Sequence, residues 1–283
     1  MVKKYFLSVA VSIGTAFCAA AHTAAVSPYT FTGRVMDARH SAFDTNRVAV
    51  VEVLDASGNI LARTKTIFSA SSRRNYAVSV PMATSTLDRY AVQGSAVIVS
   101  VTDDLGKRWS GVVVDASVGV AGGVREVDIV LGADANGDGI DDDLCSELKA
   151  QWENSEYWSY GEVFDPGRDY DGDGVATIKE VLCGTNPFNP EDVLRITEIQ
   201  RARGSGDEAA VALSFSGVGG RVYSVEEATD MARKDWSKCD FQGTGAEGAV
   251  NVISLPSNAG KKSFTVYLLP SSSKGGFYRV KAE

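Results

Sequence analysis

The chain has 283 residues, of which 44% are hydrophobic and 23% charged, and its formal net charge is −8. This length and apolar content predict two or three compact units, each long enough to bury a core. No stripe of basic residues interleaved with aromatic ones is present, which argues against a nucleic-acid partner.

The acidic charge is concentrated in one segment. Residues 134–192 contain 16 of the 36 acidic residues and 3 of the 28 basic ones, a net charge of −13, whereas the rest of the chain sums to +5. The overall charge is therefore a property of this segment and is no guide to the surface of the whole protein.

Residues 1–25 predict a secretory signal peptide. Two lysines precede an apolar run with a small-residue end, where Ala19-Ala20-Ala21 or Thr23-Ala24-Ala25 offers a cleavage site. The run is too short and too often interrupted by polar residues for a membrane anchor. We expect a mature chain without a membrane span that is secreted, either extracellular or at the cell surface, with the periplasm as the alternative.

Residues 26–132 predict a β-sandwich. Short segments rich in β-branched and aromatic residues are separated by turn signals, and several alternate apolar and polar residues as strands with one buried face do. The expected strands are 29–37, 47–55, 60–66, 75–81, 96–102, 107–114 and 124–131. Their order resembles the carboxypeptidase regulatory-like, transthyretin-type β-sandwich, which implies an immunoglobulin-like pair of antiparallel sheets.

Residues 194–283 predict a second sandwich. Val211, Leu213 and Phe215 share one face of an expected strand, and glycine-rich turns separate the segments. The expected strands are 193–199, 209–217, 221–228, 250–256, 262–269 and 276–282. The predicted fold class is thus mainly β: two small antiparallel β-sandwich domains joined by a module with short helices at residues 133–193.

Within that module, residues 169–180 (DYDGDGVATIKE) have the spacing of a calcium loop. Acids recur at positions 1, 3 and 5, a glycine at position 6 permits a tight turn, and a glutamate at position 12 can close the site with both oxygens. The predicted ligands are Asp169, Asp171, Asp173, the carbonyl of Val175, Thr177 and Glu180.

Residues 134–145 (DANGDGIDDDLC) are a weaker copy of this loop. Cys145 stands at position 12, where the bidentate acid belongs. The site is therefore expected to be weaker, completed by water or another carboxylate, or to hold no metal. Its predicted ligands are Asp134, Asn136, Asp138, the carbonyl of Ile140 and Asp142.

Neither loop is preceded by a helix, so a calcium sensor built from EF-hands is not favoured, although both loops are EF-hand-like. The run 169–192 resembles the bacterial thrombospondin type 3 repeat, in which such a loop and a short helix end in Gly-Thr-Asp/Asn-Pro. Here that terminator is Gly184-Thr185-Asn186-Pro187. The resemblance implies that Asp169, Asp171, Asp173 and Glu180 bind calcium. Two such loops 35 residues apart also leave a dockerin-like module open.

Between the loops, residues 144–158 predict a helix. Leu144, Leu148 and Trp152 recur at i, i+4 spacing and share a face. The aromatic residues near its end suggest either a sugar-stacking platform or, in the reading we favour, a small core seated against the loops.

Two cysteines flank the calcium-loop stretch. Cys145 ends the first loop and Cys183 follows the second, which in an exported protein favours a disulfide between them; three free buried thiols, with Cys239 as the third, are the alternative.

No catalytic arrangement is evident. Outside the signal peptide the one histidine is His40, expected on a solvated loop, so histidine-dependent triads and zinc sites are disfavoured and we expect no enzyme. The sequence predicts a secreted or cell-surface, non-catalytic, calcium-binding structural or adhesion-type protein in which calcium rigidifies the linker between two β domains. The alternative is a carbohydrate- or protein-binding module, either an adhesin or an accessory subunit of an exported enzyme assembly, whose partner is a glycan or another surface protein.

Overall fold

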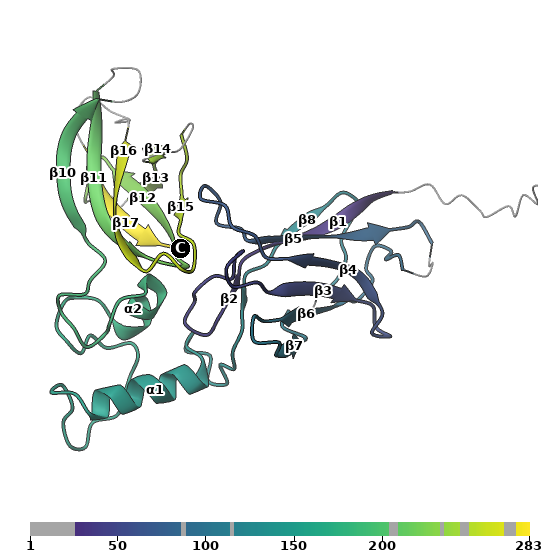
Figure 1. The fold of residues 1–283 in the computed structure, drawn as a ribbon, viewed down its shortest axis with the longest axis horizontal. Helices are drawn as coiled ribbons and strands as arrows, with labels where there is room; N and C mark the ends of the chain where they lie inside the picture. Colours follow the sequence, from purple (N-terminus) through teal and green to yellow (C-terminus); the bar gives the residue numbers. More distant parts are fainter. Residues whose placement is uncertain are drawn as a thin grey trace, which may run out of the picture.

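The computed structural model describes residues 26–85, 89–113, 116–203, 209–232, 235–243, 249–268 and 276–283. The predicted signal peptide and its cleavage sites lie outside these ranges. The protein is mainly β, as predicted, with several sheets and two helices in the described part (Figure 1). Neither described helix is long and apolar enough to cross a membrane.

The N-terminal β unit, residues 26–131, is built from two main sheets that enclose one core. In one sheet β1 (Val26–Gly33) lies between β5 (Tyr76–Met82) and β8 (Val124–Glu126). The other has the order β4 (Ile60–Lys65), β3 (Val50–Leu54), β6 (Ile98–Thr102) and β7 (Arg108–Ser110). The predicted alternation holds in β5, where Tyr76, Val78 and Val80 are buried and the residues between them are exposed.

Two strand pairs in this unit are parallel, which corrects the expectation of wholly antiparallel sheets. β1 pairs with β8, and β2 (Val35–Met36) pairs with β9 (Ile129–Val130). Gly33 ends β1 at φ +152°, and a Cβ there would lie 2.0 Å from the carbonyl oxygen of Val127. The returning chain can approach β1 this closely only because the position has no side chain.

The C-terminal β unit, residues 196–283, also has two sheets. The first has the order β10 (Ile196–Arg203), β11 (Ala209–Val218), β16 (Lys261–Leu268) and β14 (Phe241–Gly243). In the second, β12 (Val222–Ala228) pairs with β13 (Ser237–Lys238), β15 (Ile253–Ser254) and β17 (Phe277–Ala282). The buried side chains between them are Leu213, Phe215, Tyr223, Val225, Phe241, Leu255, Val266 and Leu268.

The loop segment, residues 132–195, connects the two β units and contains both helices, α1 (Asp142–Glu153) and α2 (Thr177–Cys183). Leu144, Leu148 and Trp152 are buried on one face of α1, as the spacing predicts. They form a third hydrophobic cluster with Phe164 and Val181. Trp152 contacts the rings of Phe164 and Tyr170, which stack on each other, so its ring lies in this cluster and not on a surface platform. The loop segment therefore has a small core of its own.

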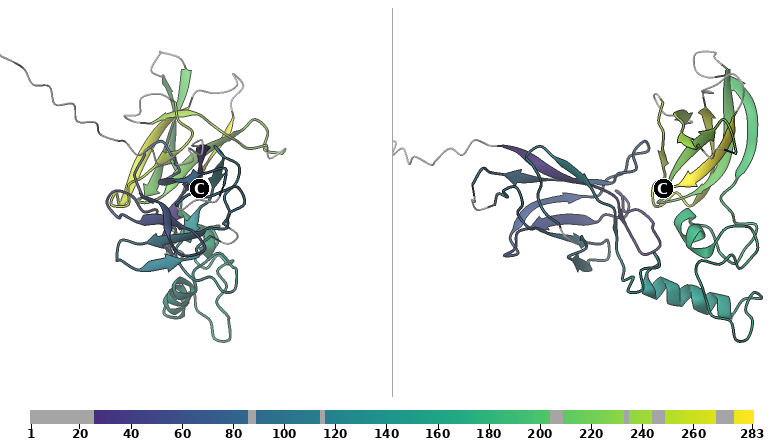
Figure 2. Two further views of the ribbon diagram at one scale, coloured as in Figure 1. Left: turned by 90° about the vertical axis from the view of Figure 1, so that its right-hand side faces the viewer. Right: turned by 180° about the vertical axis from the view of Figure 1, so that it is seen from behind.

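The parts of the molecule also touch one another. In Figures 1 and 2, α2 lies between α1 and the C-terminal sheets, and the two β units meet near the ends of the strands. At this meeting point the amide of Ala42 donates to the carbonyl of Gly220 (2.9 Å), and Asp44 accepts from the amide and hydroxyl of Ser257 (2.6 and 3.0 Å). The three clusters fall within the predicted ranges 26–132, 133–193 and 194–283, although this division into domains stays a prediction.

Candidate metal centre

The two acidic loops are wound in the same way. Asp134 and Asp169, at position 1, each accept from the backbone amides of positions 4 and 6, at 2.8 and 3.0 Å in the first loop and 2.8 Å twice in the second. The amide of position 9 then donates to the carbonyl just before the loop, at 2.6 and 2.9 Å respectively. Carboxylates that accept local backbone amides fold a turn without any help from distant residues.

A glycine at position 6 makes this winding possible. Gly139 and Gly174 have φ angles of +87° and +93°, in the left-handed region that side chains with a Cβ rarely enter. Gly174 turns the chain so that positions 1, 3 and 5 of the second loop face one point.

The second loop brings three carboxylates together. Oxygens of Asp169, Asp171 and Asp173 all lie within 4.8 Å of one another. One buried oxygen of Asp171 and one of Asp173 have no hydrogen-bond partner in the described part of the chain. A buried carboxylate oxygen without a partner carries a large desolvation penalty, which a positive charge at this point would reduce.

Glu180, at position 12, is fully buried on α2. Its Oε1 accepts from the hydroxyl of Thr185 (3.2 Å), whereas Oε2 has no partner among the described residues. Thr185 belongs to the Gly-Thr-Asn-Pro terminator, and its amide also donates to the carbonyl of Glu180 (3.0 Å). The Gly-Thr-Asn-Pro pattern predicted no role for Thr185, whose hydroxyl orients the Glu180 carboxyl in the structure.

The carboxylates of the second loop disfavour one another's charge. Burial, followed by repulsion from Asp173 and Asp171, raises the pKa of Glu180 to about 8. Burial also raises the pKa of Asp171, with Asp173 and Asp169 adding to the rise. Either protons or a cation would relieve this repulsion, and a donor set made only of oxygens suits a hard divalent cation.

Val175 and Thr177, the remaining predicted ligands of the second loop, also take part in hydrogen bonds of the turn. The amide of Val175 donates to Asp173 (2.7 Å) as part of the turn. The hydroxyl of Thr177 is buried and donates to the carbonyl of Arg168 (3.1 Å). Thr177 therefore closes the loop at its base, and its ligation of calcium stays a prediction.

The first loop has the same turn but a different chemistry. The side-chain amide of Asn136 donates to Asp138 (2.9 Å), and the carboxylate of Asp142 accepts from the amide of Ala135 (3.3 Å). Ile140 is buried, and Cys145 is half-buried against the third cluster. Among the His, Cys, Asp and Glu residues of the described ranges, Asp134, Asp138 and Asp142 do not converge as the second-loop aspartates do.

The predicted disulfide is not formed. Cys145, Cys183 and Cys239 are all free thiols. Cys145 lies on α1 and packs against the third cluster, whereas the chain at Cys183 faces the C-terminal β unit, where its carbonyl accepts from the Tyr223 hydroxyl (3.2 Å). Burial raises the pKa of the Cys183 thiol to about 11. The two cysteines flank the second loop in sequence, but their helices hold them in different environments.

His40 is not a solvated loop residue. It adopts a left-handed φ of +57°, and its imidazole hydrogen-bonds the backbone of Gly139 in the first loop. Burial lowers its pKa, so the neutral imidazole is favoured. His40 thus joins the N-terminal β unit to the first loop and has a packing role.

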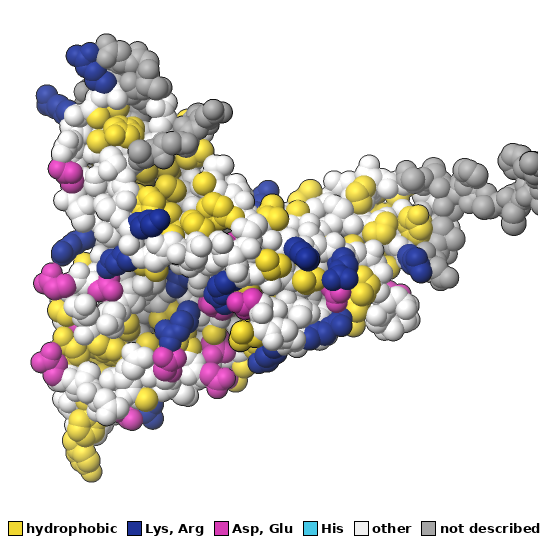
Figure 3. All heavy atoms as spheres, viewed as in Figure 1, with side chains coloured by type: hydrophobic (Ala, Val, Ile, Leu, Met, Phe, Trp, Pro, Cys, Tyr) yellow, Lys and Arg dark blue, Asp and Glu magenta, His cyan; other side chains and the backbone are white. Residues whose placement is uncertain are grey.

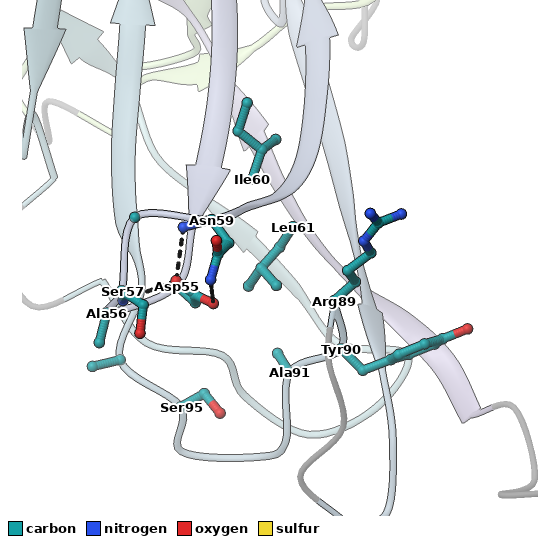
Figure 4. A pocket seen from close by; sticks show the side chains of 12 residues that line it. Asp55, Ala56, Ser57, Asn59, Ile60, Leu61, Arg89, Tyr90, Ala91 and Ser95 are labelled. Atoms are coloured by element: carbon teal, nitrogen blue, oxygen red, sulfur yellow. Dashed lines mark hydrogen bonds between the residues drawn. The ribbon is translucent and has the colours of Figure 1, made fainter.

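A concavity of about 960 Å³ lies elsewhere, at the end of the N-terminal β unit between the β3–β4 turn and residues 89–96 (Figure 4). The Asp55 carboxylate there accepts from the amides of Ser57 and Asn59 and from the Asn59 side chain. Arg89 and Tyr90 lie across the concavity from this turn and extend away from it. Its polar groups are satisfied internally or point apart, so it lacks the convergent groups of a ligand site.

Acidic side chains are prominent over the loop segment in Figure 3. Comparison of the chain with protein-family models, with curated proteins and with solved structures gave no match.

Proposed function

We propose that this protein is a secreted or cell-surface, non-catalytic structural protein whose 169–180 loop binds calcium and thereby rigidifies the link between its two β units. One observation carries the proposal: Asp171, Asp173 and Glu180 each keep a buried carboxylate oxygen without a partner in the described chain. Calcium takes six to eight oxygen ligands, commonly including a bidentate glutamate at position 12, and Glu180 supplies such a group.

The proposed mechanism is electrostatic. Without a cation the clustered carboxylates repel one another, which loosens the 169–180 loop and α2. With calcium they become ligands, and α2 is held against the C-terminal β unit, where the Tyr223 hydroxyl bonds the Cys183 carbonyl. An extracellular calcium module needs an affinity of only about 10⁻⁴ to 10⁻³ M.

Calorimetric titration of calcium into chelator-treated protein, residues 26–283, tests this proposal. Asp169→Ala removes a second-loop carboxylate, and Asp134→Ala is the matched control at position 1 of the first loop. We expect one site in the wild type, its loss in Asp169→Ala and its retention in Asp134→Ala. A wild type that binds no calcium would contradict the proposal.

Solution scattering tests the structural consequence. The scattering profile is expected to become more compact and less variable on addition of calcium, and to revert with chelator. Calcium binding with unchanged scattering would leave a cation site but remove its proposed role in the linker.

A second function is favoured by exposed aromatic residues that follow α1. Trp158 is 42% exposed and Tyr160 95%, with their rings edge-to-face at 6.5 Å, and Val163 is 81% exposed. Large exposed apolar side chains that gather at one place suit a partner surface. The alternative function is adhesion to a glycan or another surface protein through these residues. Loss of binding in Trp158→Ala and Tyr160→Ala, on a glycan array or in a pull-down from culture supernatant, would support it.

A further inference from the structure

Arg221 occupies the place where all three parts of the molecule meet. It directly precedes β12, and its side chain is 7% exposed. It lines a cavity of about 330 Å³. The other walls come from the 37–47 loop of the N-terminal β unit, from Leu148 of α1 and from the end of α2.

The Arg221 guanidinium connects two of these parts directly. Its Nη2 donates to the carbonyl of Arg39 in the N-terminal β unit (2.5 Å) and to the carbonyl of Val181 in α2 (3.1 Å). Val181 is the residue after Glu180 and lies in the last turn of α2. Carbonyls at the end of a helix carry partial negative charge and attract a cation.

Among the described residues no carboxylate is paired with Arg221, in contrast with the other arginines that line this cavity. Arg39 pairs with Glu147 (2.5 Å), and Arg47 pairs with Asp37 and Asp104 (2.8 and 3.0 Å). Nε and Nη1 of Arg221 have no hydrogen-bond partner within the described ranges. A buried charge with unmade hydrogen bonds is a poor source of stability, whereas it can specify one arrangement of the groups around it.

We propose that Arg221 couples cation occupancy of the 169–180 loop to the contact between the two β units. This inference rests on the proposed function. A cation held by Glu180 fixes α2, and the same helical turn presents the Val181 carbonyl to Arg221. Arg221 then bridges α2 to Arg39, so this one of the contacts that hold the N-terminal β unit forms only when α2 is in place. Coupling between sites is reciprocal. The factor by which the bound cation favours the Arg221 bridge is therefore also the factor by which the bridge raises the affinity for the cation.

Another anchor between the β units provides a matched control. Asp44 and Ser257 join the two units without touching α2, through hydrogen bonds of 2.6 and 3.0 Å. Ser257→Ala removes the 3.0 Å bond and leaves Arg221 and α2 intact. It therefore weakens the contact between the β units without breaking the proposed coupling.

The test compares Arg221→Met with Ser257→Ala and the wild type by calcium calorimetry, by scattering with and without calcium, and by thermal unfolding in chelator. Arg221→Met is expected to weaken calcium binding about 5- to 50-fold, within the usual range of coupling between sites, and to lose the calcium-dependent change in scattering. Its thermal stability in chelator should be unchanged or higher, because an apolar side chain replaces a buried unpaired charge. Ser257→Ala should bind calcium with wild-type affinity.

Wild-type calcium affinity in Arg221→Met, together with a retained scattering change, would overturn the coupling. Absence of calcium binding in the wild type would instead contradict the proposed function, so the two failures are distinguishable. Should Arg221→Met not fold, Arg221→Gln replaces it: its shorter, neutral amide cannot bridge both carbonyls, and the same loss of affinity is expected. Wild-type affinity in that variant would overturn the coupling equally.

Discussion

The two acidic loops have the same backbone conformation and differ in the side chains at positions 3 and 12. In both, position 1 accepts the amides of positions 4 and 6, a left-handed glycine occupies position 6, and a helix begins at position 9. At position 3, Asn136 donates to Asp138, whereas Asp171 has no hydrogen to donate to Asp173. At position 12, one loop has a half-buried thiol and the other a buried carboxyl. The winding of the loop and its capacity for a cation are therefore set by different residues.

This contrast explains why unmet carboxylate oxygens are found in the second loop. In the first loop Asn136 donates to Asp138, which gives that carboxylate a partner within the loop. The second loop has an acid at each corresponding position, so its carboxylates repel until something neutralises them. Four predictions test the contrast.

The largest effect is expected at position 12. Glu180→Gln removes the charge of the bidentate group while keeping its shape. Calcium affinity should fall by about 100-fold or more, because an amide cannot supply the two charged oxygens that a glutamate at position 12 gives the ion. Calorimetry measures this loss. Cys145→Ser is the matched control in the first loop and should bind as the wild type does; equal losses in both variants would show that the two loops are not distinct.

Cys145→Glu should make the loops more alike. It supplies the missing acid to the first loop, and the number of calcium ions bound per chain is expected to rise from one to two, with the new site the weaker. The calorimetric stoichiometry and thermal unfolding in chelator are both needed, because Cys145 packs against the third cluster and a glutamate there costs stability. An unchanged stoichiometry in a folded variant would show that position 12 is not what limits the first loop.

pH should act on the second loop through Glu180, whose folded-state pKa of about 8 lies above the ordinary value of 4.5. The folded protein then binds more protons than the unfolded chain between these values, so in chelator the free energy of unfolding should fall as pH rises from about 5 to 8. Because a proton competes with the cation, calcium affinity should rise about tenfold per pH unit up to about pH 8. Denaturant unfolding and calorimetry across this range measure both pH dependences. A wild type whose stability and calcium affinity change with pH as little as those of Glu180→Gln would contradict the prediction.

The smallest effect is expected at position 3. Asp171→Asn copies the first loop and lets an amide donate to Asp173, so calcium affinity should fall several-fold while the thermal midpoint in chelator rises. Asn136→Asp is the reverse change and should lower that midpoint, because it removes the bond to Asp138 and adds a like charge. Calorimetry and thermal unfolding of these two variants test whether the hydrogen bond from the Asn136 side chain to Asp138 stabilises the first loop in the absence of calcium.

Local sequence patterns predicted the buried faces of individual strands and helices. The alternation in β5 and the i, i+4 spacing of Leu144, Leu148 and Trp152 identified buried faces because each depends only on the geometry of its own element. The predicted helix 144–158 is displaced, since α1 starts at Asp142 and ends at Glu153. There the amide and side chain of Asn154 bond the last carbonyls of the helix.

Non-local relations were beyond these patterns. Alternation tells which face of a strand is buried but not which strand lies beside it, so the parallel pairing of β1 with β8 was not foreseen. The spacing of Cys145 and Cys183 likewise says nothing about the environments that their helices give them. Arg221 belongs to no motif, and its role depends on carbonyls of Arg39 and Val181 that come near it only in the folded chain.

The parallel pairing in the N-terminal β unit also bears on the order of folding. Thr30 pairs with Val124, so that sheet closes only after most of the unit has been gathered, whereas the turn at Asp169 needs partners no more than five residues away. Distant pairings fold in about milliseconds to seconds, and a loop of about ten residues closes within about 100 ns. The acidic loops are therefore expected to acquire their winding first, and the slow step in refolding should be closure of the N-terminal sheet in which β1 pairs with β8.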